Sequence, residues 1–441
     1  MKYAASLLMR RGDEIYWVRR RDDLPFLSGF HAFPGGVVQQ SDGDTAVDPD
    51  GACRRAALRE TLEETGVDLG VDLDALRSVG RWRAPPYLVI ALETRFYSIE
   101  TDAEPHVGPT NDELAEGEWI RPTEALARWQ ASEVLLAPPT FELLRRLAND
   151  ALCDDEAEDP DFSPIRPHID LFPVRTPTLP PATHTNCYVV GDTRLAVFDP
   201  ASPYLDERAR LDAYLDARIA AGAAVECLVL THDHVDHVSG AVHLAERLGV
   251  PIWAHAETAS RVDIPIARLL SEGDVIDLGD HLLDMVHTPG HAPGHLVFFD
   301  RATRSAVVGD MVAGIGSILV GPDDGDMGEY LDSLDRMRGL GFSCLMPAHG
   351  PVIGGATAKL TEYIDHRNGR ERQAITALKQ GAADIRTLVD RVYLDVPAMM
   401  KMGPQGGAAG ASLRSHLDKL EREGRASVSD GVWTLTSTTA G

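Results

Sequence analysis

Three histidines and two aspartates crowd into the seven residues from Thr231 to His237. Neutral imidazoles and carboxylates together suit zinc, and iron or manganese also bind such ligands. His232 and His234 stand two residues apart and can face one ion, whereas Asp236 and His237 follow a bend and can face a second. The spacing therefore predicts a site for two ions. The alternatives are a solvated polar loop and a single structural zinc, for which the cluster is too large.

The elements around this segment must bring further ligands to it. An apolar stretch over 227–230 directly precedes it and predicts a buried strand that ends at the rim of a sheet, where α/β proteins bind metals and substrates. Three later apolar stretches each run into a histidine or an aspartate. They are 282–286 before His291, 305–308 before Asp310 and 342–346 before His349. We expect these strand ends to gather the side chains beside the first cluster.

The motif His232-x-His234-x-Asp236-His237 resembles the signature of the metallo-β-lactamase family, whose other metal residues also follow separate strands. The resemblance implies an αββα sandwich with two zinc ions, or iron or manganese in their place, and a bridging hydroxide that attacks a thioester, lactone, amide or phosphodiester. It implies Asp236 and Asp310 as catalytic carboxylates, and Asp199 as an acid that braces the metal loop from outside the ligands. The implied ligands are His232, His234 and His291 for the first ion, Asp236, His237 and His349 for the second, and Asp310 as the bridge.

A second group of carboxylates lies on a predicted helix over 52–65. Glu60, Glu63 and Glu64 are spaced i, i+3 and i+4, so they share one face of that helix. Three carboxylates on one face repel one another unless a cation neutralises them, and hard oxygen ligands suit Mg²⁺ or Mn²⁺. The alternative is an ordinary charged helix face that ends at Gly66.

Together with Phe33-Pro34-Gly35-Gly36 upstream, the sequence from Arg59 to Val67 resembles the Nudix box. That family hydrolyses nucleoside diphosphates linked to another group. The resemblance implies that Glu60, Glu63 and Glu64 bind the metal, that Glu63 and Glu64 act in catalysis, and that Arg59 supports them. Two departures stand out: the loop before the helix is longer than usual, and Gly51 occupies the position of an earlier glutamate.

The C-terminal part predicts helices over 360–379, 385–389 and 411–422, a glycine-rich loop over 400–410, and a hairpin over 425–435 with an Asp-Gly turn. This pattern resembles the winged-helix tail of small endoribonuclease-like members of the metallo-β-lactamase family. The residues of the last helix that could contact phosphates are Arg414, His416, Lys419 and Arg422. The acidic residues Asp418, Glu421 and Glu423 on the same helix favour the alternative, a packing or homodimer element.

The whole chain, 441 residues long, has room for about three domains. We expect a Nudix α/β/α sandwich over 1–150, an acidic, proline-rich connector over 151–180, a metallo-β-lactamase αββα sandwich over 181–358 and a winged-helix domain over 359–441. The net charge of −26 argues against broad binding to nucleic acid, DNA in particular. The five cysteines lack paired spacing, which indicates reduced thiols and a cytoplasmic protein. No apolar run is long enough to span a membrane.

These observations predict a hydrolase with two catalytic units, a dinuclear metal centre and a nucleoside-diphosphate hydrolase. The substrate of the dinuclear centre is expected to be a small molecule or RNA. The tail favours an RNA phosphodiester, while the acidic charge favours a thioester, as in enzymes of the glyoxalase II type. A third interpretation is a regulatory protein with an inactive Nudix sensor and a DNA-binding winged helix, which the glycine at position 51 would favour.

Overall fold

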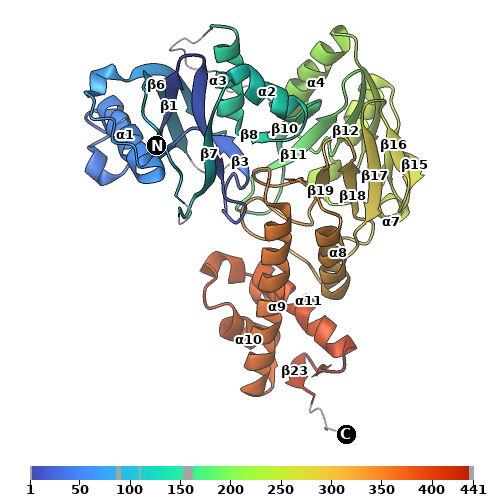
Figure 1. Ribbon diagram of the computed structural model, residues 1–441. Helices are drawn as coiled ribbons and strands as arrows, with labels where there is room; N and C mark the ends of the chain where they lie inside the picture. Colours follow the sequence, from blue (N-terminus) through green and yellow to red (C-terminus); the bar gives the residue numbers. More distant parts are fainter. Residues whose placement is uncertain (1, 86–90, 109–110, 152–161, 437–441) are drawn as a thin grey trace. The chain divides into compact units, whose positions relative to one another are not determined.

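A computed structural model of the chain describes residues 2–85, 91–108, 111–151 and 162–436. The chain divides into two compact units, which are described separately here (Figure 1). The first unit comprises Met1–Leu195, Ser202–Ala224 and Gly350–Gly355, and the second comprises Ala196–Ala201, Val225–His349 and Ala356–Gly441. The units therefore do not follow the predicted domain borders, because segments that are distant in sequence join each of them.

The N-terminal part of the first unit is a mixed sheet with helices packed on it. Its first two strands form an antiparallel hairpin, and a later strand runs parallel to the first. The carboxylate helix begins at Pro49, earlier than predicted, because the Asp48 side chain caps it by accepting the Gly51 N–H. A predicted strand over 87–94 lies partly outside the described residues. The elements are β1 (Lys2–Arg11), β2 (Glu14–Arg20), β3 (Phe30–Ala32), β4 (Gly35–Val37), α1 (Pro49–Thr65), β5 (Arg77–Arg83), β6 (Leu92–Glu100), β7 (Leu114–Ile120), α2 (Pro122–Gln130), β8 (Leu135–Leu136) and α3 (Pro138–Ala148).

The prediction of a connector over 151–180 is wrong for two segments, 163–166 and 169–175, because the structure shows strands there. Strands β9 (Ser163–Arg166) and β10 (Ile169–Arg175) are antiparallel, and β10 pairs with β11 (His184–Val190). Prolines inside both strands argued against them, but β9 lies at the sheet edge, where a missing N–H is tolerated, and Pro173 of β10 lies beyond the residues of β10 that pair with β9. Helix α4 (Leu205–Ala220) packs on β10. The acidic part of the connector, over 153–160, lies outside the described residues.

In the second unit, the predicted strands before each candidate metal ligand are confirmed. One group of neighbouring strands has the order β15-β14-β13-β12, and a five-stranded sheet has the order β16-β17-β18-β19-β20 (Figure 1). Their bounds are β12 (Arg194–Phe198), β13 (Ala224–Val229), β14 (Ile252–His255), β15 (Ile266–Leu270), β16 (Val275–Asp277), β17 (Leu282–His287), β18 (Leu296–Asp300), β19 (Ser305–Gly309) and β20 (Cys344–Pro347). The helices between them are α5 (Val235–Val238), α6 (Ala241–Leu248), α7 (Ala256–Arg261) and α8 (Met327–Gly339).

The C-terminal part of the second unit has the predicted helices and hairpin. Trp433 is buried at the centre of its apolar core. The glycine-rich loop is shorter than predicted, because the last helix already begins at Gly407. The elements are α9 (Ala356–Lys379), β21 (Ala383–Asp384), α10 (Ile385–Val392), α11 (Gly407–Arg422), β22 (Ala426–Ser429) and β23 (Val432–Leu435), with the strands in the order β21-β23-β22. The mixed α/β fold class is thus confirmed. Among the described residues, no helix combines the length and apolarity that crossing a membrane requires.

One core residue of α11, His416, is a polar side chain that is fully buried. His416 was a predicted phosphate contact, and that prediction is wrong because the side chain is 0% exposed. Neither ring nitrogen has a hydrogen-bond partner within the described part of the chain. Burial, reinforced by Arg367 and Lys419, lowers the pKa of His416 from 6.5 to about 3.

We expect His416→Leu to make the chain less sensitive to acid. A folded-state pKa below the unfolded value means that stability is complete above pH 6.5 and falls as the pH drops toward 3. At pH 5 the imidazole therefore costs about 2 kcal/mol of unfolding free energy relative to pH 8, and the leucine variant should lose that difference. Urea unfolding at both pH values, with His243→Leu on α6 as the control, measures it. An unchanged pH dependence in His416→Leu would contradict this account.

Candidate functional site

The first candidate site of the second unit is a group of three ring nitrogens. His232 and His234 follow β13, and His291 follows β17. His232 Nε2 lies 3.0 Å from His234 Nδ1 and 3.3 Å from His291 Nε2, and the latter two atoms are 3.0 Å apart. Ligands placed tetrahedrally around zinc at about 2.1 Å lie about 3.4 Å from one another. The three nitrogens are therefore spaced as ligands of one ion.

A second group shares this corner of the unit. The Nε2 atom of His349 lies 3.5 Å from Asp236 Oδ2 and 3.4 Å from Asp310 Oδ1. Asp310 also reaches both neighbours: Oδ1 is 3.6 Å from His237 Nε2 and Oδ2 is 3.5 Å from His291 Nε2. With one oxygen toward each group, this carboxylate can join two ions. The seven ligands proposed from the sequence are thus brought together at the ends of separate strands.

Two buried polar atoms at the centre lack partners. His237 Nε2 and Asp310 Oδ1 make no hydrogen bond within the described residues, although both are inaccessible to solvent. Although burial opposes ionisation, His349 and His237 hold the pKa of Asp310 well below its usual value, so the carboxylate is charged. Buried polar atoms without partners are costly, and a divalent cation would satisfy both. The residues present therefore fit a dinuclear metal centre.

The hydrogen bonds behind the imidazoles fix which nitrogen faces inward. His234 Nε2 donates to Asp324 Oδ2 at 2.7 Å, and His291 Nδ1 donates to the Leu319 carbonyl at 2.9 Å. In each ring, the nitrogen that faces the other histidines therefore carries the lone pair that a metal needs. Asp324 was not among the candidates from sequence, although the acidic stretch over 323–326 ahead of α8 was a signal for it.

Asp199 anchors the loop that carries the first cluster. Its Oδ1 accepts the Thr231 N–H at 2.8 Å, and its Oδ2 accepts both the Thr231 hydroxyl at 2.7 Å and His237 Nδ1–H at 2.8 Å. Because the Thr231 hydroxyl proton is used here, His232 Nδ1–H donates to that oxygen at 3.0 Å and Nε2 is left free to bind metal. This geometry agrees with the bracing role that the resemblance implies. Thr231 was not among the candidates from sequence.

The carboxylates of α1, in the first unit, do not form an equivalent set. Glu64 is buried, and its Oε2 accepts the Gly35 N–H at 2.9 Å. Burial raises the pKa of Glu64 to about 8. Glu60 is half-buried, while the Glu63 side chain is 55% exposed and pairs with Arg59 at 2.9 Å. The helix thus presents one desolvated carboxyl and two that already share the guanidinium of Arg59, which lies 2.8 Å from Glu60.

Arg59 has a partner that the sequence analysis missed. Its Nε and Nη2 atoms lie 2.9 Å from the two oxygens of Asp42, a buried carboxylate in the long loop before α1. This bidentate pair raises the pKa of Arg59 above its usual value. Gly51, where the box has a glutamate, instead donates its N–H to the side chain of Asp48, the residue that caps α1. The longer loop therefore gives Arg59 an acidic partner even though Gly51 has no side chain.

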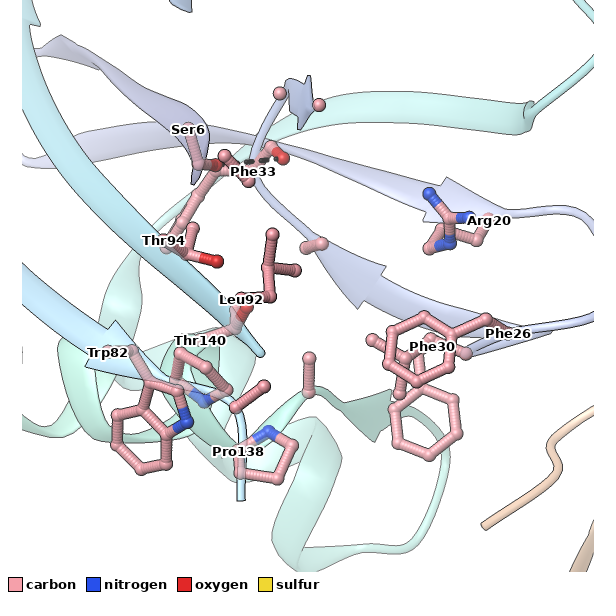
Figure 2. A pocket seen from close by; sticks show the side chains of 18 of the residues that line it. Ser6, Arg20, Phe26, Phe30, Phe33, Trp82, Leu92, Thr94, Pro138 and Thr140 are labelled. Atoms are coloured by element: carbon pink, nitrogen blue, oxygen red, sulfur yellow. Dashed lines mark hydrogen bonds between the residues drawn. The ribbon is translucent and has the colours of Figure 1, made fainter. Parts of the chain in front are cut away.

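A cavity of about 500 Å³ adjoins Glu60 and Glu64 (Figure 2). Its wall is mostly apolar and aromatic, as ligand cavities usually are. Figure 2 shows Trp82 on one side of the cavity and Phe26 and Phe30 on the other. Residues beyond the N-terminal domain also contribute, namely Ser163, Ile165, Leu171, Pro351 and Val352. The first unit thus builds a ligand-sized space next to its carboxylates from three separate parts of the chain.

The predicted phosphate contacts on α11 are occupied by carboxylates. Lys419 Nζ lies 2.7 Å from Glu371 and 2.6 Å from Glu423. Arg414 pairs with Asp418 at 2.6 Å. These ion pairs favour the packing role of the helix over contact with nucleic acid.

Comparisons with known proteins agree with this geometry. The metallo-beta-lactamase superfamily model matches residues 180–349, the NUDIX domain model residues 2–138, and the beta-lactamase associated winged helix domain model residues 385–433. The chain is similar to a beta-lactamase-like protein 2 homolog of Caenorhabditis elegans, at 26% identity over 54% of this chain and 79% of that protein. It is also similar to an atrochrysone carboxyl ACP thioesterase of Aspergillus chevalieri, at 31% identity over 48% of this chain and 69% of that protein.

Two solved structures share the fold of this chain. A beta-lactamase domain protein from Burkholderia ambifaria has a TM-score of 0.56 at 19% identity and covers 64% of this chain and 96% of its own. A metallo-beta-lactamase family protein from Thermus thermophilus has a TM-score of 0.51 at 23% identity and covers 61% and 99%.

We expect Asp199→Asn to weaken metal binding by about 10–100-fold, the usual effect of losing a residue that orients a metal ligand. The amide can no longer accept from both Thr231 and His237, so the ligand loop loses its anchor. Asp300→Asn is a matched control, because Asp300 is also buried and bonds a threonine hydroxyl and a histidine away from the site. Metal content after dialysis against graded chelator measures the effect. Equal metal retention in the two variants would contradict the anchoring role.

Proposed function

This chain belongs to the metallo-β-lactamase superfamily, as a hydrolase with an N-terminal Nudix domain, and from that premise we propose that its second unit is a dinuclear metal thioesterase. The observation that carries the proposal is the convergence of seven buried or half-buried ligand side chains, with the carboxylate of Asp310 between two groups of histidines. Zinc suits this ligand set best, with iron or manganese as alternatives.

The chemistry divides between the ions and the protein. When bound, two such ions supply a water nucleophile at neutral pH and polarise the scissile carbonyl. Asp324, the Leu319 carbonyl and Asp199 accept the proton on the outward nitrogen of His234, His291 and His237, so the inward nitrogen of each ring is the one that offers a lone pair to metal. Each imidazole is therefore oriented before any ion or substrate arrives, which limits the reorganisation that catalysis requires.

A thioester is favoured over an RNA phosphodiester as the substrate. The curated relative with 31% identity is named as an acyl-carrier-protein thioesterase. The chain carries a net charge of −26, which repels a polyanion. Arg414 and Lys419, the candidate contacts for phosphate, are already paired with carboxylates. These three observations favour a thioester as the substrate.

We expect the full-length chain, loaded with zinc, to hydrolyse S-acyl pantetheine thioesters. His232→Ala should lower kcat/KM by more than about 100-fold, since it removes a ligand and not merely a residue that orients one. His243→Ala, on α6 and outside the cluster, should leave kcat/KM unchanged. Single-stranded RNA is the competing substrate in the same assay. A metal-loaded chain that cleaves RNA and no thioester would replace this proposal with the phosphodiesterase, and one that cleaves neither would overturn both.

For the first unit we propose hydrolysis of a diphosphate bond, with Mg²⁺ or Mn²⁺ held by Glu60, Glu63 and Glu64. The supporting observation is Glu64, a buried carboxyl with a pKa of about 8 beside a cavity of about 500 Å³. A divalent cation would stabilise its ionised form, and oxygen ligands suit Mg²⁺.

Glu64→Gln should lower Mg²⁺-dependent turnover of a panel of nucleoside diphosphate conjugates by about 100-fold or more. The amide keeps the size of the side chain but loses the charge that would bind the ion. Glu118→Gln, on β7 and paired with Arg128, is the control. If the wild-type chain turns over none of the conjugates, while binding them in calorimetry, the unit is a sensor and not an enzyme.

A further inference from the structure

The loop between β19 and α8, residues 310–326, contacts both the candidate metal ligands and the C-terminal helices of the same unit. It has no regular secondary structure, yet most of its first half is buried. Such a long irregular segment needs partners for its backbone polar groups. Those partners lie on two sides of the loop, the candidate metal ligands on one and the C-terminal helices on the other.

On one side, the loop holds the metal ligands. Asp310 belongs to it, Leu319 accepts from His291 Nδ1 at 2.9 Å, and Asp324 accepts from His234 Nε2 at 2.7 Å. The Gly314 N–H also donates to the carbonyl of His349 at 2.8 Å. Four of the seven candidate ligands therefore either belong to this loop or are bonded to it.

On the other side, buried side chains of α9 and α11 hold the same loop. The Tyr363 hydroxyl accepts the Ala313 N–H at 2.8 Å and donates to the Gly316 carbonyl at 3.1 Å. Arg367 donates to the Ile318 carbonyl, and the Ser415 hydroxyl donates to the Val320 carbonyl at 2.8 Å.

These two sets of contacts alternate along the loop. Arg367 bonds residue 318, His291 bonds residue 319 and Ser415 bonds residue 320. Arg367 is only 2% exposed and lies over the ring of Tyr330, whose hydroxyl donates to the carbonyl of Met311 at 2.7 Å. A charged donor to a buried carbonyl is a strong hydrogen bond. The backbone at 318–320 is consequently fixed from the tail at the same point where it fixes His291.

We infer that the C-terminal helices are a positioning element for the metal centre: Arg367 and Ser415 hold the loop that orients His291 and His234. This inference rests on the proposed metal centre. It gives the tail a role that needs no nucleic acid, and it agrees with the neutralised cations of α11. Tyr363 and Arg422, which pairs with Asp326, extend the same contact along the loop.

The test compares pairs of matched variants of the full-length chain. Arg367→Gln removes the bond to Ile318, whereas Arg370→Gln removes an arginine that is also buried in α9, 8% exposed, but bonds Asp395 and not the loop. Ser415→Ala and Ser412→Ala form a milder pair on α11, and Ser412 is also buried. The readouts are the rate at which a chelator removes zinc and the visible absorption spectrum of the Co²⁺-substituted protein. Both readouts are independent of hydrolytic activity.

We expect Arg367→Gln to release metal about tenfold faster and Ser415→Ala severalfold faster, with altered Co²⁺ spectra, because the positioning of ligands affects metal affinity. Arg370→Gln and Ser412→Ala should match the wild type. If both members of a pair release metal at the same rate, the loop is not held from the tail and the inference is overturned. Ser415→Ala decides the question if Arg367→Gln does not fold. A wild-type chain that binds no divalent ion overturns the proposed metal centre and this inference with it.

Discussion

The second unit depends on a cluster of imidazoles and carboxylates that are buried or half-buried. Burying ionisable groups together is unfavourable unless each is hydrogen-bonded or neutralised. Here the outward nitrogens are satisfied by Asp199, Asp324 and a backbone carbonyl, but the inward atoms, such as His237 Nε2 and Asp310 Oδ1, face only one another. A divalent cation would give these inward atoms the partners that they lack, so the arrangement fits the proposed metal centre.

Close backbone approaches make this packing feasible. Gly290 precedes His291 with φ of 125°, and a Cβ there would lie 2.2 Å from the backbone nitrogen of Tyr330. Gly309 precedes Asp310 with φ of 46°, and a Cβ would lie 2.6 Å from His295 Nε2, the atom that accepts the Asp310 N–H. Each ligand therefore follows a residue whose conformation and space favour glycine. His295 thus positions the backbone of Asp310 and leaves its carboxylate free.

The sequence predicted these ligands because each one follows a strand, and strand ends meet at one edge of a sheet. It could not predict the Leu319 carbonyl, since the role of that group depends on the path of an irregular loop, and the acidic stretch over 323–326 did not by itself connect Asp324 with His234. Strands β9 and β10 were missed for a different reason: prolines lower the expectation of a strand, and a strand is compatible with them only because β9 is an edge strand and Pro173 of β10 lies beyond the residues that pair with β9. Likewise, the cations of α11 looked available for phosphate until Glu371, far away in sequence, was found beside Lys419. The spacing of residues along the sequence cannot show which charged side chains pair in the folded chain.

In the first unit, other residues compensate for Gly51, which stands where the Nudix box has a glutamate. Asp42, in the lengthened loop, accepts hydrogen bonds from Nε and Nη2 of Arg59. The remaining nitrogen of Arg59, Nη1, bonds Glu60 and Glu63. Those two carboxylates are therefore held in place and partly neutralised before any metal arrives. Among the described residues, Glu64 forms no ion pair; its Oε2 accepts the Gly35 N–H, and burial raises its pKa to about 8. Because an entering divalent ion would gain most from a desolvated carboxylate without an ion-paired cation, we expect Glu64 to contribute most to the metal binding proposed for this helix.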